Sequence, residues 1–199
     1  MARYLFPLAL ALLLIVVTAA LLLGGPETRL DPRILAAFAR PDLVPAARFL
    51  THLGDGWTVL VAAVMAAGGL LAAGHRRRAI LLLVILASEK LLVEAMKAGF
   101  DRARPDVVGH QVAVHNMAFP SGHSANSMSV WLAIALLATG PRLRRPAVAL
   151  ALAIAFTVGV CRMILQVHWP SDVAGGWAFG AAWTLLLVRL FGTAPPAPH

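Results

Sequence analysis

The stretch AVALALAIAFTVGVCRMILQVHWPSD, residues 147–172, decides the fold class of this 199-residue chain. Its first part, 147–165, is apolar apart from Thr157 and Arg162. An α-helix crosses the hydrocarbon core of a bilayer, about 30 Å thick, with roughly 20 mostly apolar residues. A polar cluster that ends at Asp172 follows this run directly. The stretch therefore predicts a membrane-spanning helix with polar and charged side chains, suited to binding or catalysis, at one end.

Comparable apolar runs extend along the rest of the chain. The sequence is 60% hydrophobic and 13% charged, roughly half the charged fraction of a soluble domain. Six runs approach the length of a span: 5–23, 57–73, 79–96, 124–139, 147–165 and 173–191. We therefore predict an all-α polytopic membrane protein, a bundle of six transmembrane helices in a single domain over 1–199. The run 5–23 has a second interpretation as a cleaved signal peptide, because Arg3 precedes it, and the tail 194–199 is expected to be disordered.

Basic residues gather on one side of this predicted bundle. If six helices alternate in direction, that side has no acidic residue and carries Arg3, Arg76, Arg77, Arg78, Arg142, Arg144, Arg145 and Arg189. Cytoplasmic loops of membrane proteins are enriched in Lys and Arg, so both termini are predicted to face the cytoplasm. The same placement favours a membrane surface over nucleic acid as the reason for the net charge of +8.

Two longer loops lie on the opposite, outward side. The loop 24–56 mixes apolar and charged residues and contains Pro41 and Pro45. It is interpreted either as one or two short interfacial helices broken near these prolines, or as a loop packed on the bundle. The second loop, 97–119, joins two of the polar clusters described next.

Three polar clusters each lie at the outward end of a predicted span: KAGFDRARP at 97–105, FPSGHS at 119–124 and CRMILQVHWPSD at 161–172. Lys97, Arg104 and Arg162 supply three cations. Guanidinium groups match the oxygen geometry of a phosphate, and an ammonium adds a compact charge. The clusters therefore predict a site for a phosphate dianion.

The second cluster also predicts an anion site in the backbone. Pro120 suits the first turn of a helix, which leaves the amides of Ser121, Gly122 and His123 as unpaired donors at the helix N-terminus. Gly122 lets the backbone approach a ligand closely.

His168 and Asp172 form a candidate catalytic pair. Pro170 is expected to open the last span, so that Asp172 lies in its first turn and reaches back to His168. A carboxylate on one ring nitrogen fixes the tautomer and leaves the other nitrogen free to attack. His123 can protonate the leaving oxygen. This set makes a phosphoryl-transfer site that requires no metal or other cofactor, because the cations can stabilise the equatorial oxygens.

The three clusters together resemble a family signature. Lys-x6-Arg-Pro, Pro-Ser-Gly-His and Arg-x5-His-x3-Asp, within the core motifs 97–172, are similar to the signature of the type 2 phosphatidic acid phosphatase (PAP2)/vanadium haloperoxidase superfamily. The resemblance implies the family's six-helix membrane fold, with His168 as nucleophile, Asp172 as its orienting partner and His123 as general acid and then base. It implies that the phosphate is held by Lys97, Arg104, Ser121, Gly122 and Arg162.

One position departs from the signature. Cys161 stands where the family usually has Ser before the third-motif Arg. Cysteine is a weak hydrogen-bond donor, so the exchange is expected to remove one hydrogen bond at or near the phosphate.

The function implied by the resemblance is hydrolysis of lipid phosphates through a phosphohistidine, on the periplasmic or outer face of a bacterial inner (plasma) membrane. The second cluster is similar to that of bacterial members acting on undecaprenyl diphosphate or phosphatidylglycerophosphate, and phosphatidic acid, diacylglycerol diphosphate and lipid A phosphates stay open. Expected partners are the lipid substrate and membrane lipids, with no nucleic acid and no obligate protein. The alternatives are a lipid phosphotransferase using the same site, a non-enzymatic lipid transporter or scaffold, and a vanadium-dependent haloperoxidase.

Two structural details follow from spacing. Lys90 and Glu94 share one helical face, and we interpret them as an ion pair inside the bundle. The pair Gly175-Gly176 with Gly180 places small residues four apart, which favours close helix packing.

Overall fold

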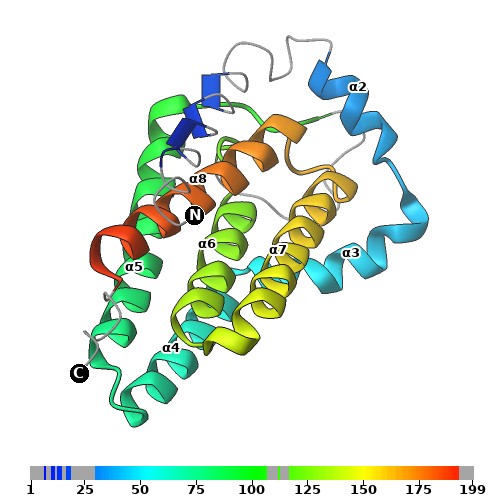
Figure 1. Cartoon of the computed structure of the whole chain (residues 1–199). Coiled ribbons are helices and arrows are strands. Elements are labelled where there is room, and N and C mark those ends of the chain that lie inside the picture. The colour runs from blue at the N-terminus through cyan, green and yellow to red at the C-terminus, as the bar shows by residue number, and fades with distance from the viewer. Residues whose placement is uncertain are drawn as a thin grey trace.

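The computed structural model describes residues 30–106, 112 and 117–192, together with isolated positions between 7 and 18. These residues form an all-α fold without strands, as predicted. The five long helices in Figure 1 are α4 (Gly56–Ala72), α5 (Arg76–Phe100), α6 (Gly122–Leu137), α7 (Pro141–Ile164) and α8 (Pro170–Phe191). They coincide with the second to the sixth predicted span. The predicted run 5–23, apart from isolated positions, and the tail 194–199 lie outside the described residues.

Helix α6 forms the centre of the bundle, because it packs against α4, α5, α7 and α8. Its contact with α8 is close at the predicted glycines. A Cβ on Gly176 would lie 2.6 Å from the carbonyl oxygen of Ser121, and one on Gly180 would lie 2.7 Å from that of Ala125. Only residues without a side chain allow two helix backbones to approach in this way. The prediction of close packing at these positions is confirmed.

An apolar cluster fills the part of the bundle between α4, α5 and α6. Val59, Leu82, Ile85 and Val130 belong to it, and each is at most 1% exposed. In a membrane the contacts among such side chains hold helices together by van der Waals packing, since lipid tails are equally apolar.

The helix directions bring the three polar clusters to one end of the bundle. Helices α5 and α7 run toward that end, whereas α6 and α8 begin there. In Figure 1 the α7–α8 connection lies at the top, and the α4–α5 and α6–α7 connections lie at the bottom. The first turns of α5 and α7, at the bottom, carry Arg76, Arg77, Arg78, Arg142 and Arg144.

Between residues 30 and 55 the chain forms four short helical segments, and we call these residues the outer segment. They are α2 (Leu30–Ala37), η1 (Pro41–Leu43), α3 (Val44–Leu50) and η2 (Thr51–Gly54). The chain breaks where the prolines predict, because Pro41 opens η1 and Pro45 lies in the first turn of α3. Helix α2 packs on α8, while α3 and η2 pack on α7. Both interpretations of the loop are therefore partly right: it forms short helices, and these lie against the bundle.

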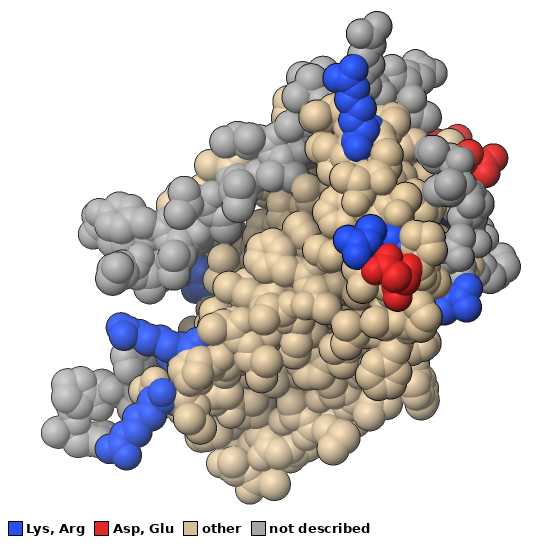
Figure 2. Space-filling view, turned by 90° about the vertical axis from the view of Figure 1, so that its right-hand side faces the viewer, with Lys and Arg blue, Asp and Glu red and all other residues tan. Residues whose placement is uncertain are grey.

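Among the described residues, fewer helices than predicted have the length and hydropathy of a membrane span. Helices α7 and α8 are long and apolar enough to cross a bilayer, and Pro41–Gly54 joined to α4 through a 45° bend would make a third span. Helix α4 has 17 residues and α6 has 16, fewer than the roughly 20 that a bilayer core requires. Helix α5 has 25 residues, but its second half carries Glu89, Lys90, Glu94 and Lys97. The predicted count of six is therefore not confirmed, although Figure 2 shows a wide surface free of charged residues on one face.

Candidate active site

The ends of α5, α6, α7 and α8 meet around the connection between α7 and α8. Helix α5 ends at Phe100 and is followed by Asp101 in the left-handed conformation, with φ of 46°, which turns the chain toward Arg102. The carbonyl oxygen of Arg102 accepts a hydrogen bond from the amide of Ala118 at 2.8 Å. The amide of Ser121 donates to the carbonyl oxygen of Asp172 at 3.0 Å. These backbone bonds join the three polar clusters into one unit.

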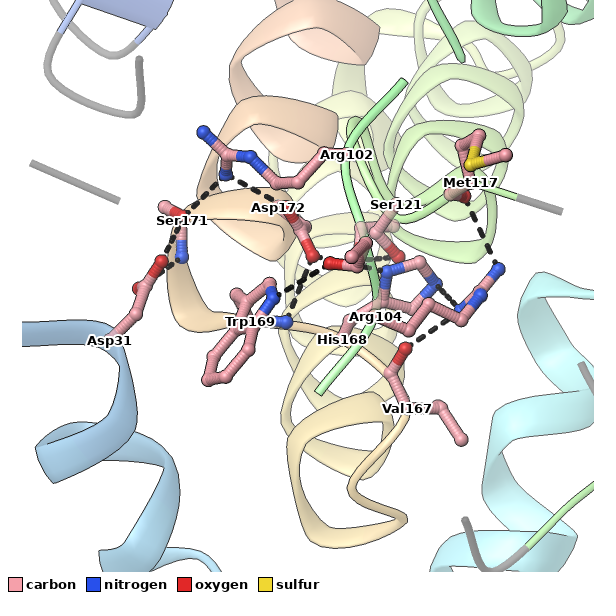
Figure 3. A network of polar contacts seen from close by, with 12 residues as sticks. Asp31, Arg102, Arg104, Met117, Ser121, Val167, His168, Trp169, Ser171 and Asp172 are labelled. Carbon is pink, nitrogen blue, oxygen red and sulfur yellow. Dashed lines mark hydrogen bonds and ion pairs between the residues drawn. The ribbon is translucent and has the colours of Figure 1, made fainter. Parts of the chain in front are cut away.

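The ring of His168 lies between a carboxylate and a guanidinium group (Figure 3). Its Nδ1 is 3.5 Å from Oδ2 of Asp172, and its Nε2 is 3.0 Å from Nη1 of Arg104. Because a guanidinium only donates, Nε2 is the unprotonated nitrogen and accepts from Arg104, so that Nδ1 carries the proton on the side of Asp172. At 3.5 Å the Asp172 carboxylate faces Nδ1 without forming a hydrogen bond to it among the described residues. Arg104 Nη1 also donates to the carbonyl oxygen of Val167 at 2.7 Å. The side chain of His168 is 2% exposed, so this tautomer is held inside the protein.

Asp172 is fully buried and occupies the first turn of α8. Its Oδ2 accepts from the amide of Trp169, the N-cap residue of α8, at 2.9 Å. Its Oδ1 accepts from Nη1 of Arg102 at 3.0 Å. A carboxylate is favoured at a helix N-terminus, where the backbone dipole is positive. The expected placement of Asp172 behind His168, after Pro170 opens the helix, is thus observed.

Sequence reasoning assigned no role to Arg102, although it lies within the first cluster. Its Nη1 contacts both Asp172 and Oγ of Ser171, the latter at 2.9 Å, and its guanidinium carbon lies 4.8 Å from the ring centre of Phe119. Two arginines two residues apart look alike in a sequence. Only the turn at the end of α5 decides that Arg102 faces the carboxylate while Arg104 faces the imidazole.

A second residue that sequence reasoning missed lies in the outer segment. Asp31 of α2 is 3% exposed, and its carboxylate accepts from the amide of Ser171 at 3.0 Å and from the Ser171 hydroxyl. Figure 3 shows Asp31, Ser171, Arg102 and Asp172 in a continuous line of contacts. Because Asp31 is 140 residues from Ser171, no sequence spacing predicts this link.

Lys97 lies in the last turn of α5, and its Nζ donates to Oε1 of Glu94 at 3.0 Å. The predicted ion pair between Lys90 and Glu94 is therefore wrong: Glu94 pairs with Lys97, while Nζ of Lys90 points to the start of α4, where a Cβ on Gly56 would lie 3.5 Å from it. A Cβ on Gly122 would lie 3.3 Å from Nζ of Lys97. The bare backbone of Gly122 thus leaves room for this ammonium. The amide of Ser121, the N-cap residue of α6, is not the unpaired donor that was predicted, because it donates to the carbonyl oxygen of Asp172.

Arg162 lies in the last turn of α7 and is 4% exposed. Its Nη1 donates to the hydroxyl of Thr51 in η2 at 3.2 Å, and among the described residues its buried Nε has no hydrogen-bond partner. Its neighbour Cys161 is buried in an apolar cluster with Ala47 and Leu165. The thiol thus packs among apolar side chains at the position where the signature usually has a hydroxyl.

His123, in the first turn of α6, contacts the outer segment. Its Nε2 is 2.7 Å from Oδ1 of Asp55. The second oxygen of Asp55 lies 2.5 Å from Nδ1 of His52. Sequence reasoning did not select Asp55, because an isolated acidic residue before a span carries no motif.

The electrostatics place the predicted residues in one neighbourhood. Burial lowers the pKa of His168 well below its usual value, and the positive charges of Arg104, Arg162, His123 and Lys97 lower it further. Burial likewise lowers the pKa of Arg104. The four groups whose positive charge acts on the His168 imidazole are therefore Arg104, Arg162, His123 and Lys97. His168, Asp172 and Arg104 are in contact, Ser121 is bound to the backbone of Asp172, and Lys97 lies against Gly122.

The fold and the site together define an all-helical membrane protein with a buried histidine–carboxylate pair among cations at one end of its bundle. The chain belongs to the PAP2 superfamily, whose family model matches residues 78–196.

Relatives of known activity agree with this assignment. Phosphatidylglycerophosphatase B of Bacillus subtilis is 29% identical over 181 residues, which are 87% of this chain and 89% of that protein. Lipid A 1-phosphatase of Rhizobium johnstonii is 36% identical over 111 residues, 51% of this chain. The matched region spans only 43% of the length of that lipid A phosphatase.

Solved structures show the same fold. The crystal structure of the first transmembrane PAP2 type phosphatidylglycerolphosphate phosphatase from Bacillus subtilis has a TM-score of 0.81 and 28% identity, and the match covers 94% of this chain and 96% of that one. Aquifex aeolicus LpxE has a TM-score of 0.67 and 19% identity, with coverage of 82% and 97%. The second likeness concerns the fold alone.

Proposed function

We propose that this chain is a membrane lipid phosphatase that works through a phosphohistidine at His168. The observation that carries the proposal is the position of the His168 ring, with Nδ1 toward Asp172 and Nε2 toward Arg104. A phosphoryl group approaching Nε2 meets a guanidinium group already in place for its oxygens. The negative charge of the phosphoryl group is also attracted by Arg162 and Lys97, the other two cations whose charge acts on this imidazole.

The reaction has two steps, both by in-line displacement. In the first, Nε2 of His168 bonds to phosphorus as the bond to the leaving oxygen breaks, and His123 gives that oxygen a proton. Asp172 and its partner Arg102 hold the ring while it becomes positive. In the second, water attacks phosphorus, His123 takes the water's proton, and the P–N bond breaks to release inorganic phosphate. Lys97, Arg104, Arg162, the hydroxyl of Ser121 and the amide of Gly122 stabilise the equatorial oxygens throughout.

Phosphatidylglycerophosphate is the substrate we propose first. The relative and the solved structure that match nearly the whole chain are both named for this activity, whereas the lipid A phosphatase matches only about half of it. Phosphatidic acid, undecaprenyl diphosphate and lipid A phosphates share the same phosphate chemistry and are the competitors.

We also propose the topology that the charges predict. Six spans, counting 5–23, place both termini in the cytoplasm and the active site on the outer face of a bacterial inner membrane. The basic first turns of α5 and α7 lie at the end of the bundle opposite to His168, which supports this orientation. An accessibility assay on the single-cysteine variants Arg77→Cys and Asp42→Cys, both at exposed positions, in a Cys161→Ala background, checks it in intact cells.

The test is phosphate release by the purified protein in detergent from each of these lipids. Wild-type protein is expected to release phosphate fastest from phosphatidylglycerophosphate and to form an acid-labile phosphoprotein. His168→Ala is expected to abolish both signals. His75→Ala, the same change on an exposed residue at the other end of the bundle, is the matched control and keeps full activity. Undiminished turnover in His168→Ala would refute the mechanism, and transfer of label to an acceptor lipid would show a phosphotransferase.

A further inference from the structure

Asp55 connects the candidate acid His123 to the outer segment. Oδ1 of Asp55 is 2.7 Å from Nε2 of His123, and Oδ2 is 2.5 Å from Nδ1 of His52. A carboxylate only accepts hydrogen bonds, so Nε2 of His123 donates to it. The ring of His123 is thus held by one nitrogen, and Nδ1 is the nitrogen left for chemistry.

The fold holds this contact in place from several sides. Two side chains of α6, farther along the helix than His123, bind the backbone just before Asp55: Asn126 Nδ2 donates to the carbonyl oxygen of Gly54 at 3.2 Å, and Trp131 Nε1 to that of Leu53 at 2.9 Å. Gly54 lies so close to α6 that a Cβ on it would be 2.8 Å from the carbonyl oxygen of His123. Asp55 therefore has a fixed position beside the imidazole.

Asp55 also occupies a position, the N-cap of a helix, where an aspartate normally caps the helix. It is the N-cap residue of α4, with extended backbone angles, yet its side chain makes no capping hydrogen bond. An N-cap aspartate usually accepts from the amides of its own helix and so stabilises the start of that helix. Both of its oxygens instead contact histidine rings. The side chain is used for the contact with His123 at the expense of helix capping.

We propose that Asp55 is a positioning residue for general acid–base catalysis: it orients the His123 ring through Nε2 and stabilises its protonated form. The inference rests on the proposed function, because it needs His123 to act on a leaving group. The other charged groups that act on His123 are Arg162 of α7 and Lys97 of α5, both positive. Burial of the ring and then these two cations disfavour its protonated form, and the carboxylate of Asp55 is the group that counteracts them.

The experiment compares Asp55→Asn with Asp42→Asn, the same change at an exposed site of the outer segment where Asp42 pairs only locally with Arg40. Turnover is measured from pH 5 to pH 9 (roughly the range in which a histidine titrates) with phosphatidylglycerophosphate and with p-nitrophenyl phosphate. Asp55→Asn is expected to lower kcat on the lipid by about 100-fold, the size of a general-acid contribution, with KM little changed. The basic limb of the pH profile of Asp55→Asn moves to lower pH, because the protonated His123 ring loses its negative neighbour.

The second substrate and two further variants serve as controls. The loss of kcat is smaller on p-nitrophenyl phosphate, whose leaving group needs no proton. Asp55→Glu recovers part of the rate, and Asp42→Asn behaves as wild type.

A double variant separates this role from a purely structural one. If Asp55 acts through His123, then Asp55→Asn in a His123→Ala background lowers kcat no further than His123→Ala alone. Equal losses on both substrates with an unmoved pH profile, or additive losses in the double variant, would overturn the proposal while leaving the phosphatase assignment intact. Absence of phosphate release by wild type, or full activity of His168→Ala, would overturn the proposed function and this inference with it.

Discussion

Arg102 and Asp172, which are 70 residues apart in the sequence, form a buried ion pair of 3.0 Å behind the candidate nucleophile. The side chain of Arg102 is 11% exposed and that of Asp172 is fully buried. Because the carboxylate also faces His168, this pair couples the stability of the fold to the orientation of the imidazole.

Removal of this cation is expected to leave a buried carboxylate without its charge partner. We predict that Arg102→Met lowers the free energy of unfolding by about 3 kcal/mol and lowers kcat as well, while Arg102→Lys is milder. Arg33→Met, on the exposed face of α2, is the matched control. Thermal unfolding in detergent measures the effect, and an unchanged midpoint in Arg102→Met would contradict it.

The hydrogen bonds between Asp31 of α2 and Ser171 of α8 are expected to affect activity, although these residues are not among those proposed to bind the phosphate. Asp31→Asn keeps an oxygen for the amide of Ser171 but loses the negative charge that accepts from both of its donors. We predict a loss of stability of about 1 to 2 kcal/mol and a several-fold lower kcat. Ser171→Ala should reproduce part of both losses. A fully active, fully stable Asp31→Asn protein would show that this link is dispensable.

The pH dependence of kcat/KM follows from the environment of His168. Attack requires the neutral ring, which is present above the pKa of His168, and burial together with Arg104 lowers that pKa. The nucleophile is therefore expected to stay neutral well below the usual value of about 6.5, so it adds no acid limb near neutral pH. In Arg104→Gln one positive neighbour is gone, and the acid limb should move to higher pH as the overall rate falls. The profile of kcat/KM, which reports the free enzyme, distinguishes these outcomes.

Glycines at the contact of α6 and α8 are expected to be intolerant of even a methyl group. A Cβ on Gly176 would lie 2.6 Å from the carbonyl oxygen of Ser121, so Gly176→Ala must push α8 away from the second cluster. We predict a loss of about 2 kcal/mol, typical of overpacking, and weaker substrate binding. Gly99→Ala, with nothing within 4 Å of the new Cβ, should be neutral or slightly stabilising, since alanine favours a helix. Equal behaviour of the two variants would argue against this account.

Much of the candidate site could be read from the sequence because its signals are local. Pro170 and Asp172 lie within one helical turn of His168, and Pro120 precedes the amides of Ser121 and Gly122 at the start of α6. Such short spacings fix which side chains share a helix end. The ion pair predicted for Lys90 was wrong for the opposite reason: helical spacing allowed Glu94 two partners, and the packing of α5 on α4 turned Lys90 away from it.

The sequence by itself determined the all-helical membrane class, the family and the placement of three polar clusters at helix ends, because apolar run length and short motifs are properties of neighbouring residues. Only the tertiary structure decided that the outer segment folds over these ends, so that Asp31 meets Ser171, Thr51 meets Arg162 and Asp55 meets His123. Those partners are between 68 and 140 residues apart. Contacts over such separations depend on how whole helices pack, and no local pattern in the chain encodes them.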